Sequence, residues 1–457
     1  MSELAKAIIS LLDNAASTTK RKEKESILSS ALTWNEEDQS ILKAVFVYAQ
    51  DPRISFGIKD LSDITPVTLP HDDELFLMFD VLRKLSVRSI TGQEAKAGIG
   101  RVFGSVSAST LELFKRILGR DLKAGIGAKT FNSVFGDVVY IHPYMRCSLL
   151  NEKTMPNLTF PCYSQTKLDG MYVDIRVEPD KVTYFSRDGN IMPFNDRERD
   201  SLLITFAAGY TLQGEALVLN EERNGWIDRS KNNGYLNSDD IDINRVVFVC
   251  WDAINNAEHG FHQSNVMYQS RLSFLEGVVY RVSQYNGSIV KLVDTVECST
   301  IEDVINHFKK NRSEGLEGTV VKNKLLKWKD GTSKEQLKLK VSAVGDLKVV
   351  GWKEGEGKWE GYVGSLVCQS SCGKVEVNVN CKTDAFRKKA TKSIDAWIDA
   401  GVIVSVVYND IVQNELKPEL KALYLPRMET DDIRSDKHEA DSLDRLQEIL
   451  DNFEFLV

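Results

Sequence analysis

The residues with the most distinctive chemistry lie in one short stretch, Thr166-Lys167-Leu168-Asp169-Gly170. Lys167 follows a short apolar-polar run that predicts a strand, and Asp169 with Gly170 predicts a tight turn directly after it. A lysine is normally a protonated and hydrated cation. Held at a strand end beside other cations, its amine can lose the proton and attack an electrophile such as phosphorus. The stretch therefore predicts Lys167 as a nucleophile, provided that suitable partners follow it.

Further charged and aromatic residues follow Lys167 at intervals, mostly in strand-like segments. Glu215 lies in an apolar setting, and Lys338 and Lys340 alternate on one face of a predicted strand. Taken singly, each has an ordinary explanation, such as a strand ion pair, a core position or a solvated face. The candidate site residues are Gln165, Lys167, Arg187, Glu215, Trp251, Glu317, Lys338, Lys340, Arg434 and Lys437.

In this order and spacing, the segments from about Gln165 to Lys437 resemble the motif series of the covalent nucleotidyltransferases. That superfamily contains ATP-dependent DNA ligases, RNA ligases and mRNA capping enzymes. The helical region around Arg120 to Gly125 and the segment from Arg229 to Asn237 are similar to the T-even bacteriophage DNA ligases in particular. The resemblance implies an ATP-dependent DNA ligase that seals 5′-phosphate/3′-hydroxyl nicks in duplex DNA during replication, repair and recombination.

The resemblance also implies a role for each candidate residue. Lys167 would attack the α-phosphorus of ATP and carry AMP, while Glu215 and Glu317 would lie near Mg²⁺. Lys338 and Lys340 would face the α-phosphate and disfavour protonation of Lys167. The remaining implied roles are adenine recognition for Gln165, stacking for Trp251, a ribose or nick-phosphate contact for Arg187, a ribose contact for Glu215, and pyrophosphate orientation for Arg434, Asp436 and Lys437.

Two positions depart from the family pattern. Tyr172 stands where the family commonly has arginine, and Arg176 lies too far along the strand to replace it simply. A tyrosine hydroxyl can still bond a phosphate. Gln213 stands directly before Gly214, where the family usually has an acid. The missing acid removes a secondary contact to ribose or metal.

The length of 457 residues favours about three domains. We expect a helical DNA-binding domain over 1–140, an α+β nucleotidyltransferase (adenylation) domain over 141–340, an OB-fold β-barrel over 341–441 and a tail over 442–457. The sequence Lys-Ala-Gly-Ile-Gly occurs at 96–100 and again at 123–127. Each copy predicts a glycine-ended loop after a helix, either presenting N–H groups to DNA phosphates or only capping the helix.

The tail places Leu443, Leu446, Ile449 and Leu450 at helical spacing. The pattern Gln447-x-x-Leu450-x-x-Phe453-x-Phe455 is close to the peptide with which proteins bind sliding clamps. An amphipathic helix packed on the barrel explains the same spacing, and deletion of the tail distinguishes the two interpretations.

The net charge of −8 does not argue against DNA as a partner. Ten acids and three bases lie between 429 and 457, whereas seven lysines and two acids lie between 322 and 340. Local patches rather than totals determine phosphate binding. The scattered cysteines, the short apolar runs and the N-terminal sequence favour a reducing, cytoplasmic location without a membrane span.

We expect a monomer. An RNA ligase or capping enzyme, or a non-catalytic nucleic-acid-binding scaffold, remains an alternative. The large helical region disfavours the first two, and the intact set of candidate residues disfavours the third.

Overall fold

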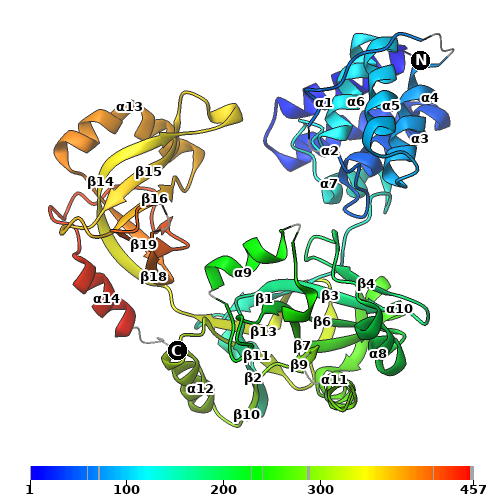
Figure 1. The fold of residues 1–457 in the computed structure, drawn as a ribbon. Coiled ribbons are helices and arrows are strands. Elements are labelled where there is room, and N and C mark those ends of the chain that lie inside the picture. Colours follow the sequence, from blue (N-terminus) through cyan, green and yellow to red (C-terminus); the bar gives the residue numbers. More distant parts are fainter. Residues whose placement is uncertain are drawn as a thin grey trace. The chain divides into compact units, whose positions relative to one another are not determined.

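In the computed structural model the chain folds into two compact units (Figure 1). The structure describes residues 2–58, 60–69, 73–227, 229–238, 240–285, 289–414 and 416–452. The first unit consists of residues 1–144, 171–264 and 274–291, and the second consists of residues 145–170, 265–273 and 292–457. The chain passes from the second unit to the first directly after Gly170, at the end of the Lys167 stretch.

The N-terminal part of the first unit is helical, as the sequence predicts. Polar residues begin several helices, because their side chains accept hydrogen bonds from otherwise unpaired N–H groups; Asn35, Asp73 and Ser107 do so. Buried apolar side chains such as Leu12, Phe46 and Leu82 form one core between these helices. The helices are α1 Ser2–Ala16, α2 Arg21–Ser29, α3 Glu36–Gln50, α4 Glu74–Ser86, α5 Gly92–Ser105, α6 Ala108–Leu118 and α7 Ala128–Phe135, with the 3₁₀ turn Ser30–Thr33 after α2.

The first Lys-Ala-Gly-Ile-Gly copy was predicted as a loop, and this prediction is wrong, because residues 96–100 lie inside α5. The glycines allow another segment to approach the helix: a Cβ atom at Gly100 would lie 2.4 Å from the carbonyl oxygen of Thr65. The second copy lies between α6 and α7. There Lys24 donates to the carbonyl oxygens of Ala124 and Gly125, and Gly125 has a φ of +58°.

The first unit also holds a mostly antiparallel sheet with the strand order β5-β4-β3-β6-β7-β9. Its alternating apolar residues, such as Val173, Ile175 and Leu212, are fully buried on one face. The elements are β3 Met171–Val177, β4 Val182–Phe185, β5 Ile191–Met192, α8 Arg197–Ala207, β6 Tyr210–Val218, α9 Arg229–Leu236, the 3₁₀ turn Ile243–Arg245, β7 Val246–Asn255, α10 Asn256–Gly260 and β9 Val290–Leu292; β8 Gln263–Met267 and α11 Tyr268–Ser283 span the boundary of the units.

The second unit contains a five-stranded sheet with the order β1-β13-β11-β2-β10. Helix α12 begins after Thr300, which forms a reciprocal capping box with Asp303. The elements are β1 Met145–Leu149, the 3₁₀ turn Met155–Asn157, β2 Cys162–Lys167, β10 Thr295–Cys298, α12 Ile301–Ser313, β11 Gly318–Asn323, β12 Lys327–Lys329, which pairs with β8, and β13 Gly331–Lys340.

The C-terminal part of the second unit is a closed barrel with the strand order β14-β15-β16-β20-β17. Residues of β16 alternate between the buried Val377 and Val379 and the more exposed Glu376, Asn378 and Asn380. Helix α13 ends at Gly401, whose φ of 63° is the left-handed conformation expected of a helix C-terminal glycine. The elements are β14 Ala343–Glu354, the 3₁₀ turn Gly357–Trp359, β15 Val363–Gln369, β16 Glu376–Asn380, α13 Asp384–Ala400, β17 Ile403–Tyr408, β18 Asp410–Gln413, β19 Lys421–Tyr424, β20 Arg427–Met428 and α14 Leu443–Asp451.

Helix α14 packs on the barrel. Leu446 is fully buried and Leu450 is 7% exposed, both in the same apolar core as the barrel strands. The hydroxyl of Tyr408 donates to the carbonyl oxygen of Leu446 over 2.6 Å. This arrangement supports the barrel-packed interpretation of the tail helix; Phe453 and Phe455 of the clamp pattern lie outside the described residues.

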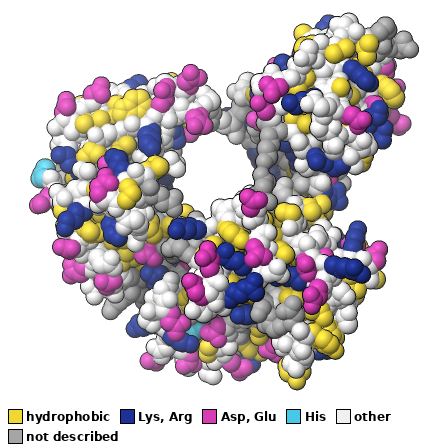
Figure 2. Space-filling model, in the orientation of Figure 1, with side chains coloured by type: hydrophobic (Ala, Val, Ile, Leu, Met, Phe, Trp, Pro, Cys, Tyr) yellow, Lys and Arg dark blue, Asp and Glu magenta, His cyan; other side chains and the backbone are white. Residues whose placement is uncertain are grey.

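Lys and Arg side chains (dark blue) and Asp and Glu side chains (magenta) are interspersed over the face of the molecule seen in Figure 2. No helix among the described residues combines the length and the apolar character needed to cross a bilayer.

Replacement of Leu446 by alanine should destabilise the barrel. Leu446 is fully buried against Gly345, so its removal leaves a cavity and should lower the unfolding free energy by about 2–4 kcal/mol. Chemical denaturation followed by tryptophan fluorescence measures this change. The control is Gln447→Ala on the exposed side of the same helix, which should change the value by less than about 0.5 kcal/mol. Equal effects of the two substitutions would contradict the packing of α14.

Candidate active site

The strand register places Lys167 beside a second lysine. Lys167 on β2 pairs with Gly318 on β11, and Gly318 pairs with Lys340 on β13. These three residues form one row across the strands. Two residues further along the same strands, a second row consists of Gln165, Val320 and Lys338. Residues in one row, and in alternate rows, project from the same face of a sheet. Gln165, Lys167, Lys338 and Lys340 therefore share one face, as the resemblance requires.

The opposite face of these strands is covered by α12. The Ser164 hydroxyl and the His307 Nδ1 atom are 2.8 Å apart, and Thr166 lies 3.3 Å from the Asn311 side chain. The Asn311 amide also donates to the carbonyl oxygen of Gly318. These buried bonds fix β2 and β11 from behind, so the spacing of the lysine face does not depend on the lysines themselves.

Gly318 is required by the backbone at the centre of this row. Its φ of +153° is one that L side chains rarely adopt, and a Cβ atom would lie 2.2 Å from the carbonyl oxygen of Leu339. The adjacent Glu317 accepts a 2.5 Å ion pair from the Lys167 amine. Burial lowers the pKa of Lys340, and the nearby Lys338 and Lys167 add to this effect while Glu317 opposes it.

Gln165 is 2% exposed, and its side-chain orientation is determined by its hydrogen bonds. Its Nε2 atom donates to the Tyr268 hydroxyl over 2.7 Å and to Thr295 Oγ1 over 3.0 Å. The buried Lys322 lies over the Tyr268 ring, 4.5 Å from its centre. Sequence reasoning missed Tyr268, because a tyrosine at the start of a helix carries no motif signal of its own.

Three other predicted site residues lie in the first unit, namely Arg187, Glu215 and Trp251. Glu215 on β6 pairs with Tyr172 on β3. Gly214 pairs with Cys250 and Gln213 with Asp252, so Trp251 is the extra residue of a β-bulge in β7. A Cβ atom at Gly214 would lie 2.6 Å from the carbonyl oxygen of Val249. Gly214 therefore permits the close strand approach beside the bulge.

An aromatic cluster forms beside Glu215. The Tyr172 ring lies 5.9 Å from the Trp251 ring and 4.8 Å from the Tyr144 ring. The Arg187 guanidinium lies 5.8 Å from the centre of the Tyr144 ring. Trp251 is thus half-buried beside other rings rather than enclosed in the core, which suits a stacking surface.

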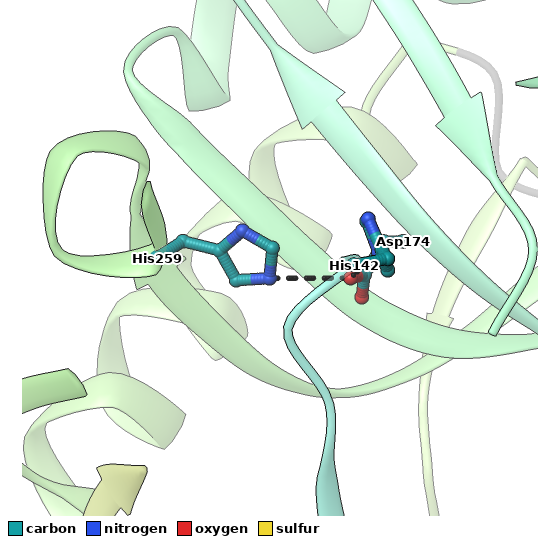
Figure 3. A group of neighbouring side chains, drawn as sticks. All are labelled: His142, Asp174 and His259. Atoms are coloured by element: carbon teal, nitrogen blue, oxygen red, sulfur yellow. Dashed lines mark hydrogen bonds and ion pairs between the residues drawn. The ribbon is translucent and has the colours of Figure 1, made fainter. Parts of the chain in front are cut away.

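A buried cluster around Asp174 lies on the same face of the sheet and was not found from the sequence (Figure 3). Asp174 Oδ2 is 2.6 Å from His142 Nε2 and 3.2 Å from His259 Nε2. Asp174 Oδ1 accepts from the Tyr172 hydroxyl and from Gln213 Nε2. The two histidines are far apart in the sequence, so no spacing pattern connects them.

Burial raises the pKa of Asp174, but the hydrogen bond with His142 and the close His259 ring outweigh it and hold the pKa below its ordinary value. A depressed folded-state pKa stabilises the fold above the unfolded-state pKa of about 4 and loses that contribution as the pH falls below it. Burial and the neighbouring Asp174 carboxylate raise the pKa of Tyr172, so its hydroxyl keeps its proton and acts as a donor.

Arg434 and Lys437 lie on the barrel and are compensated by acids. Arg434 makes two 2.8 Å bonds to Asp436, and its guanidinium is also 3.1 Å from Asp346. The Lys437 amine is 2.7 Å from Asp346 and 2.9 Å from Asp441. The structure therefore groups the predicted residues in three places. Gln165, Lys167, Lys338 and Lys340 lie in the five-stranded sheet, with Glu317 directly before β11. Glu215 and Trp251 lie in the six-stranded sheet, with Arg187 in the turn between β4 and β5, and Arg434 and Lys437 lie on the barrel.

Gly318→Ala should be strongly destabilising. The substitution adds a clash with the Leu339 carbonyl oxygen to the strain of its φ, for a total of about 3 kcal/mol or more. Gly315→Ala is the matched control, because Gly315 has a φ of +77° but no atom near its would-be Cβ, and it should cost only about 1–2 kcal/mol. Thermal unfolding measures the loss of stability in each variant. Gly318→Ala reports the steric clash together with the backbone strain, whereas Gly315→Ala reports the backbone strain alone. A Gly318→Ala variant as stable as Gly315→Ala would be inconsistent with the close approach of β11 and β13.

Comparisons with known proteins agree with this geometry. Residues 145–340 match the family model of the ATP dependent DNA ligase domain. The DNA ligases of Enterobacteria phages T6 and T4 are each 24% identical over 416 residues, which cover 81% of this chain and 83% of theirs. Two solved structures, Pmar-Lig_Pre. and Pmar-Lig_PreS3, share the fold with TM-scores of 0.69 and 0.70 at 19% identity, covering 94% and 93% of this chain and 99% and 98% of theirs.

The family resemblance is therefore confirmed from the domain match and from the phage relatives, while the fold likeness agrees independently. The lysine, its carboxylate partner and the second lysine row all lie within the matched residues 145–340. Residues 145–340 thus match the ATP dependent DNA ligase domain, and the chain as a whole is similar to the DNA ligases of phages T6 and T4.

Proposed function

We propose that this ligase seals 5′-phosphate/3′-hydroxyl nicks in duplex DNA, using ATP as AMP donor and Lys167 as the AMP carrier. The observation that supports the proposal is the row in which Lys167 and Lys340 flank Gly318 while Glu317 pairs with the Lys167 amine. A nucleophilic amine, a carboxylate and a further cation are the groups that a phosphoryl transfer needs.

In the first step the Lys167 amine attacks the α-phosphorus of ATP. A nitrogen–phosphorus bond forms, the bond to the bridging oxygen breaks, and pyrophosphate leaves. Lys338 and Lys340 share the face of Lys167 and oppose the negative charge of the α-phosphate. Before ATP binds, the ion pair with Glu317 orients the amine and stabilises its ammonium form.

Glu215 and Glu317 are the proposed Mg²⁺-binding carboxylates. Mg²⁺ favours oxygen ligands and commonly combines one or two carboxylates with substrate phosphates, and the partly buried Glu317 beside the nucleophile fits this chemistry. Held by these carboxylates, Mg²⁺ would supply positive charge that neutralises the phosphates. The Lys167 amine must lose its ammonium proton before it attacks, and the neighbouring Lys338 and Lys340 disfavour that proton.

We also propose which residues contact the adenosine part of ATP. Gln165, whose amide is held by Tyr268 and Thr295, is proposed to read the adenine edge. Trp251 is proposed to offer a stacking surface, and Glu215 and Arg187 are proposed to contact ribose or the nick phosphate. We propose that pyrophosphate is oriented by Arg434, Asp436 and Lys437. For this, Arg434 must give up its bond to Asp346, and Lys437 its bonds to Asp346 and Asp441, in exchange for bonds to phosphate.

In the second step AMP passes from Lys167 to the 5′-phosphate of the nick, and in the third the 3′-hydroxyl attacks that phosphate and releases AMP. The proposed organisation is a DNA-binding helical domain over 1–140, an adenylation domain over 141–340 and an OB-fold over 341–441. The closed five-stranded barrel with α13 supports the OB-fold assignment. We further propose that the enzyme is a monomer and, like its phage relatives, acts in the cytoplasm of a host cell.

Incubation with α-labelled ATP and Mg²⁺ tests the first step. The wild-type chain should become labelled, and Lys167→Ala should lose the label because no amine remains to form the phosphoramidate. Lys340→Ala should slow labelling by about 100-fold, since it removes a cation from the α-phosphate face. The control is Lys329→Ala on β12, an exposed lysine away from this row, which should label at the wild-type rate.

Labelling of Lys167→Ala at the wild-type level would exclude Lys167 as the carrier, and no label on the wild-type chain would exclude the proposed reaction. Nicked DNA and nicked RNA added to the labelled enzyme then identify the polymer. Discharge of the label only by nicked RNA would overturn the DNA assignment.

We propose that the C-terminal tail binds a sliding clamp, but the packing of α14 restricts which of its residues can make the contact. Leu450 is buried on the barrel, so the proposed contact uses the exposed Gln447 and the residues after 452. Gln447→Ala combined with deletion of residues 453–457 should abolish binding to an immobilised sliding clamp without lowering the melting temperature. A lower melting temperature with clamp binding retained would assign the tail a purely structural role.

A further inference from the structure

The two positions at which this chain departs from its family meet at one carboxylate. Tyr172, in place of the usual arginine, donates its hydroxyl proton to Asp174 Oδ1 over 2.7 Å. Gln213, in place of the usual acid, donates to the same oxygen over 3.0 Å and to the Tyr172 hydroxyl over 2.9 Å. The two departures are therefore physically connected rather than independent losses.

Asp174 is itself held from the other side. Its second oxygen, Oδ2, lies 2.6 Å from His142 Nε2 and 3.2 Å from His259 Nε2, and Figure 3 shows a nitrogen of the His259 ring on the side of the carboxylate. The Tyr140 hydroxyl bonds the remaining ring nitrogen of His142 over 2.8 Å. This pattern suits an Nε2–H tautomer of His142, which accepts from Tyr140 and donates to Asp174. Asp174 is fully buried, and its four bonding neighbours compensate its charge.

These bonds decide what Tyr172 can do. A tyrosine hydroxyl has one proton to donate, and here that proton goes to Asp174. Tyr172 therefore cannot donate it to a phosphate while this bond exists. What it presents instead is its ring, fixed beside Trp251 and paired across the strands with Glu215.

We propose that Asp174 is a positioning residue for the nucleotide: through Tyr172 and Gln213 it fixes an aromatic surface for ribose and base where the family has a phosphate-binding arginine. His142 on the segment before β1 and His259 on α10 hold Asp174 in turn. The inference rests on the proposed function, because it takes Trp251 and Glu215 to contact the adenosine part of ATP.

A bound transition metal is the competing interpretation of two histidines and one aspartate. Metal–ligand bonds of about 2.0–2.1 Å place neighbouring tetrahedral ligand atoms roughly 3.3 Å apart. The 2.6 Å separation of His142 Nε2 and Asp174 Oδ2 is instead that of a hydrogen bond. The other oxygen of Asp174 is also occupied by two donors, so the geometry favours the hydrogen-bonded cluster.

A double-mutant cycle on lysyl-AMP formation tests the proposal. Single-turnover labelling at increasing ATP concentration gives a maximal rate and a half-saturating ATP concentration for Tyr172→Phe, Asp174→Asn and the double variant. Each single variant should raise the half-saturating concentration by about 3- to 10-fold, with a smaller change in the maximal rate. The double variant should be no worse than the more affected single variant, because Asp174 acts through Tyr172.

The chain offers a matched control in Tyr184→Phe. The Tyr184 hydroxyl also donates to an aspartate, Asp200, over 2.7 Å, from a buried strand position of the same sheet. This substitution should lower the melting temperature and leave the half-saturating ATP concentration unchanged. His259→Leu should reproduce the effect of Asp174→Asn, whereas His259→Gln, which keeps an N–H donor, should restore most of the wild-type affinity.

Three outcomes would overturn the inference. Lower melting temperatures with unchanged ATP saturation would make the cluster purely structural, and additive effects in the double variant would separate Asp174 from Tyr172. One bound zinc per wild-type chain, lost in His259→Leu and detected by elemental analysis, would make the cluster a metal site. If Asp174→Asn fails to fold, the ATP saturation of His259→Leu compared with that of His259→Gln tests the inference instead. Failure of the wild-type chain to label would instead reject the proposed function itself.

Discussion

The arrangement of the sheet face that carries Lys167, Lys338 and Lys340 depends on how closely β11 approaches β13 at Gly318. Only a residue without Cβ fits there, and the approach sets the distance between the strands that carry Lys167 and Lys340. Two amines on either side of one glycine repel each other, so the arrangement needs a compensating anion and a rigid support. Glu317 supplies the anion from the adjacent position, and Asn311 of α12 bonds the Gly318 carbonyl oxygen from behind.

Much of this face could be predicted from the sequence, because strand periodicity determines which residues share a face. Lys338 and Lys340 differ by two positions, as do Gln165 and Lys167, so each pair must project from one side. The Thr300 cap of α12, the terminal glycine of α13 and the alternation of β16 are likewise local properties, which a sequence pattern can indicate without knowledge of the tertiary fold. The order of the motifs then identified the family, which the domain match confirms.

The features that sequence reasoning missed are those created by tertiary contact. The glycines at 98 and 100 suggest a loop on propensity alone, but within α5 Gly98 lies against the Ile90 and Val81 side chains and Gly100 lets the backbone at Thr65 pack directly on the helix. His142 and His259 meet only because both segments pack on β3 at Asp174. Tyr172 was interpreted as a potential phosphate ligand, because no local pattern shows that its hydroxyl proton is already used. Arg434 and Lys437 likewise carry acidic partners from a strand far earlier in the chain.

The bulge at Trp251 has a consequence for how such enzymes diverge. Trp251 is the extra residue of this bulge, since Gly214 pairs with Cys250 and Gln213 pairs with Asp252. An extra residue of this kind lies outside the ladder, so its replacement or deletion leaves the register of the flanking pairs intact. The framework of the sheet can therefore stay unchanged while the side chain at the bulge changes. A single mutation can introduce, remove or exchange an aromatic residue at this position.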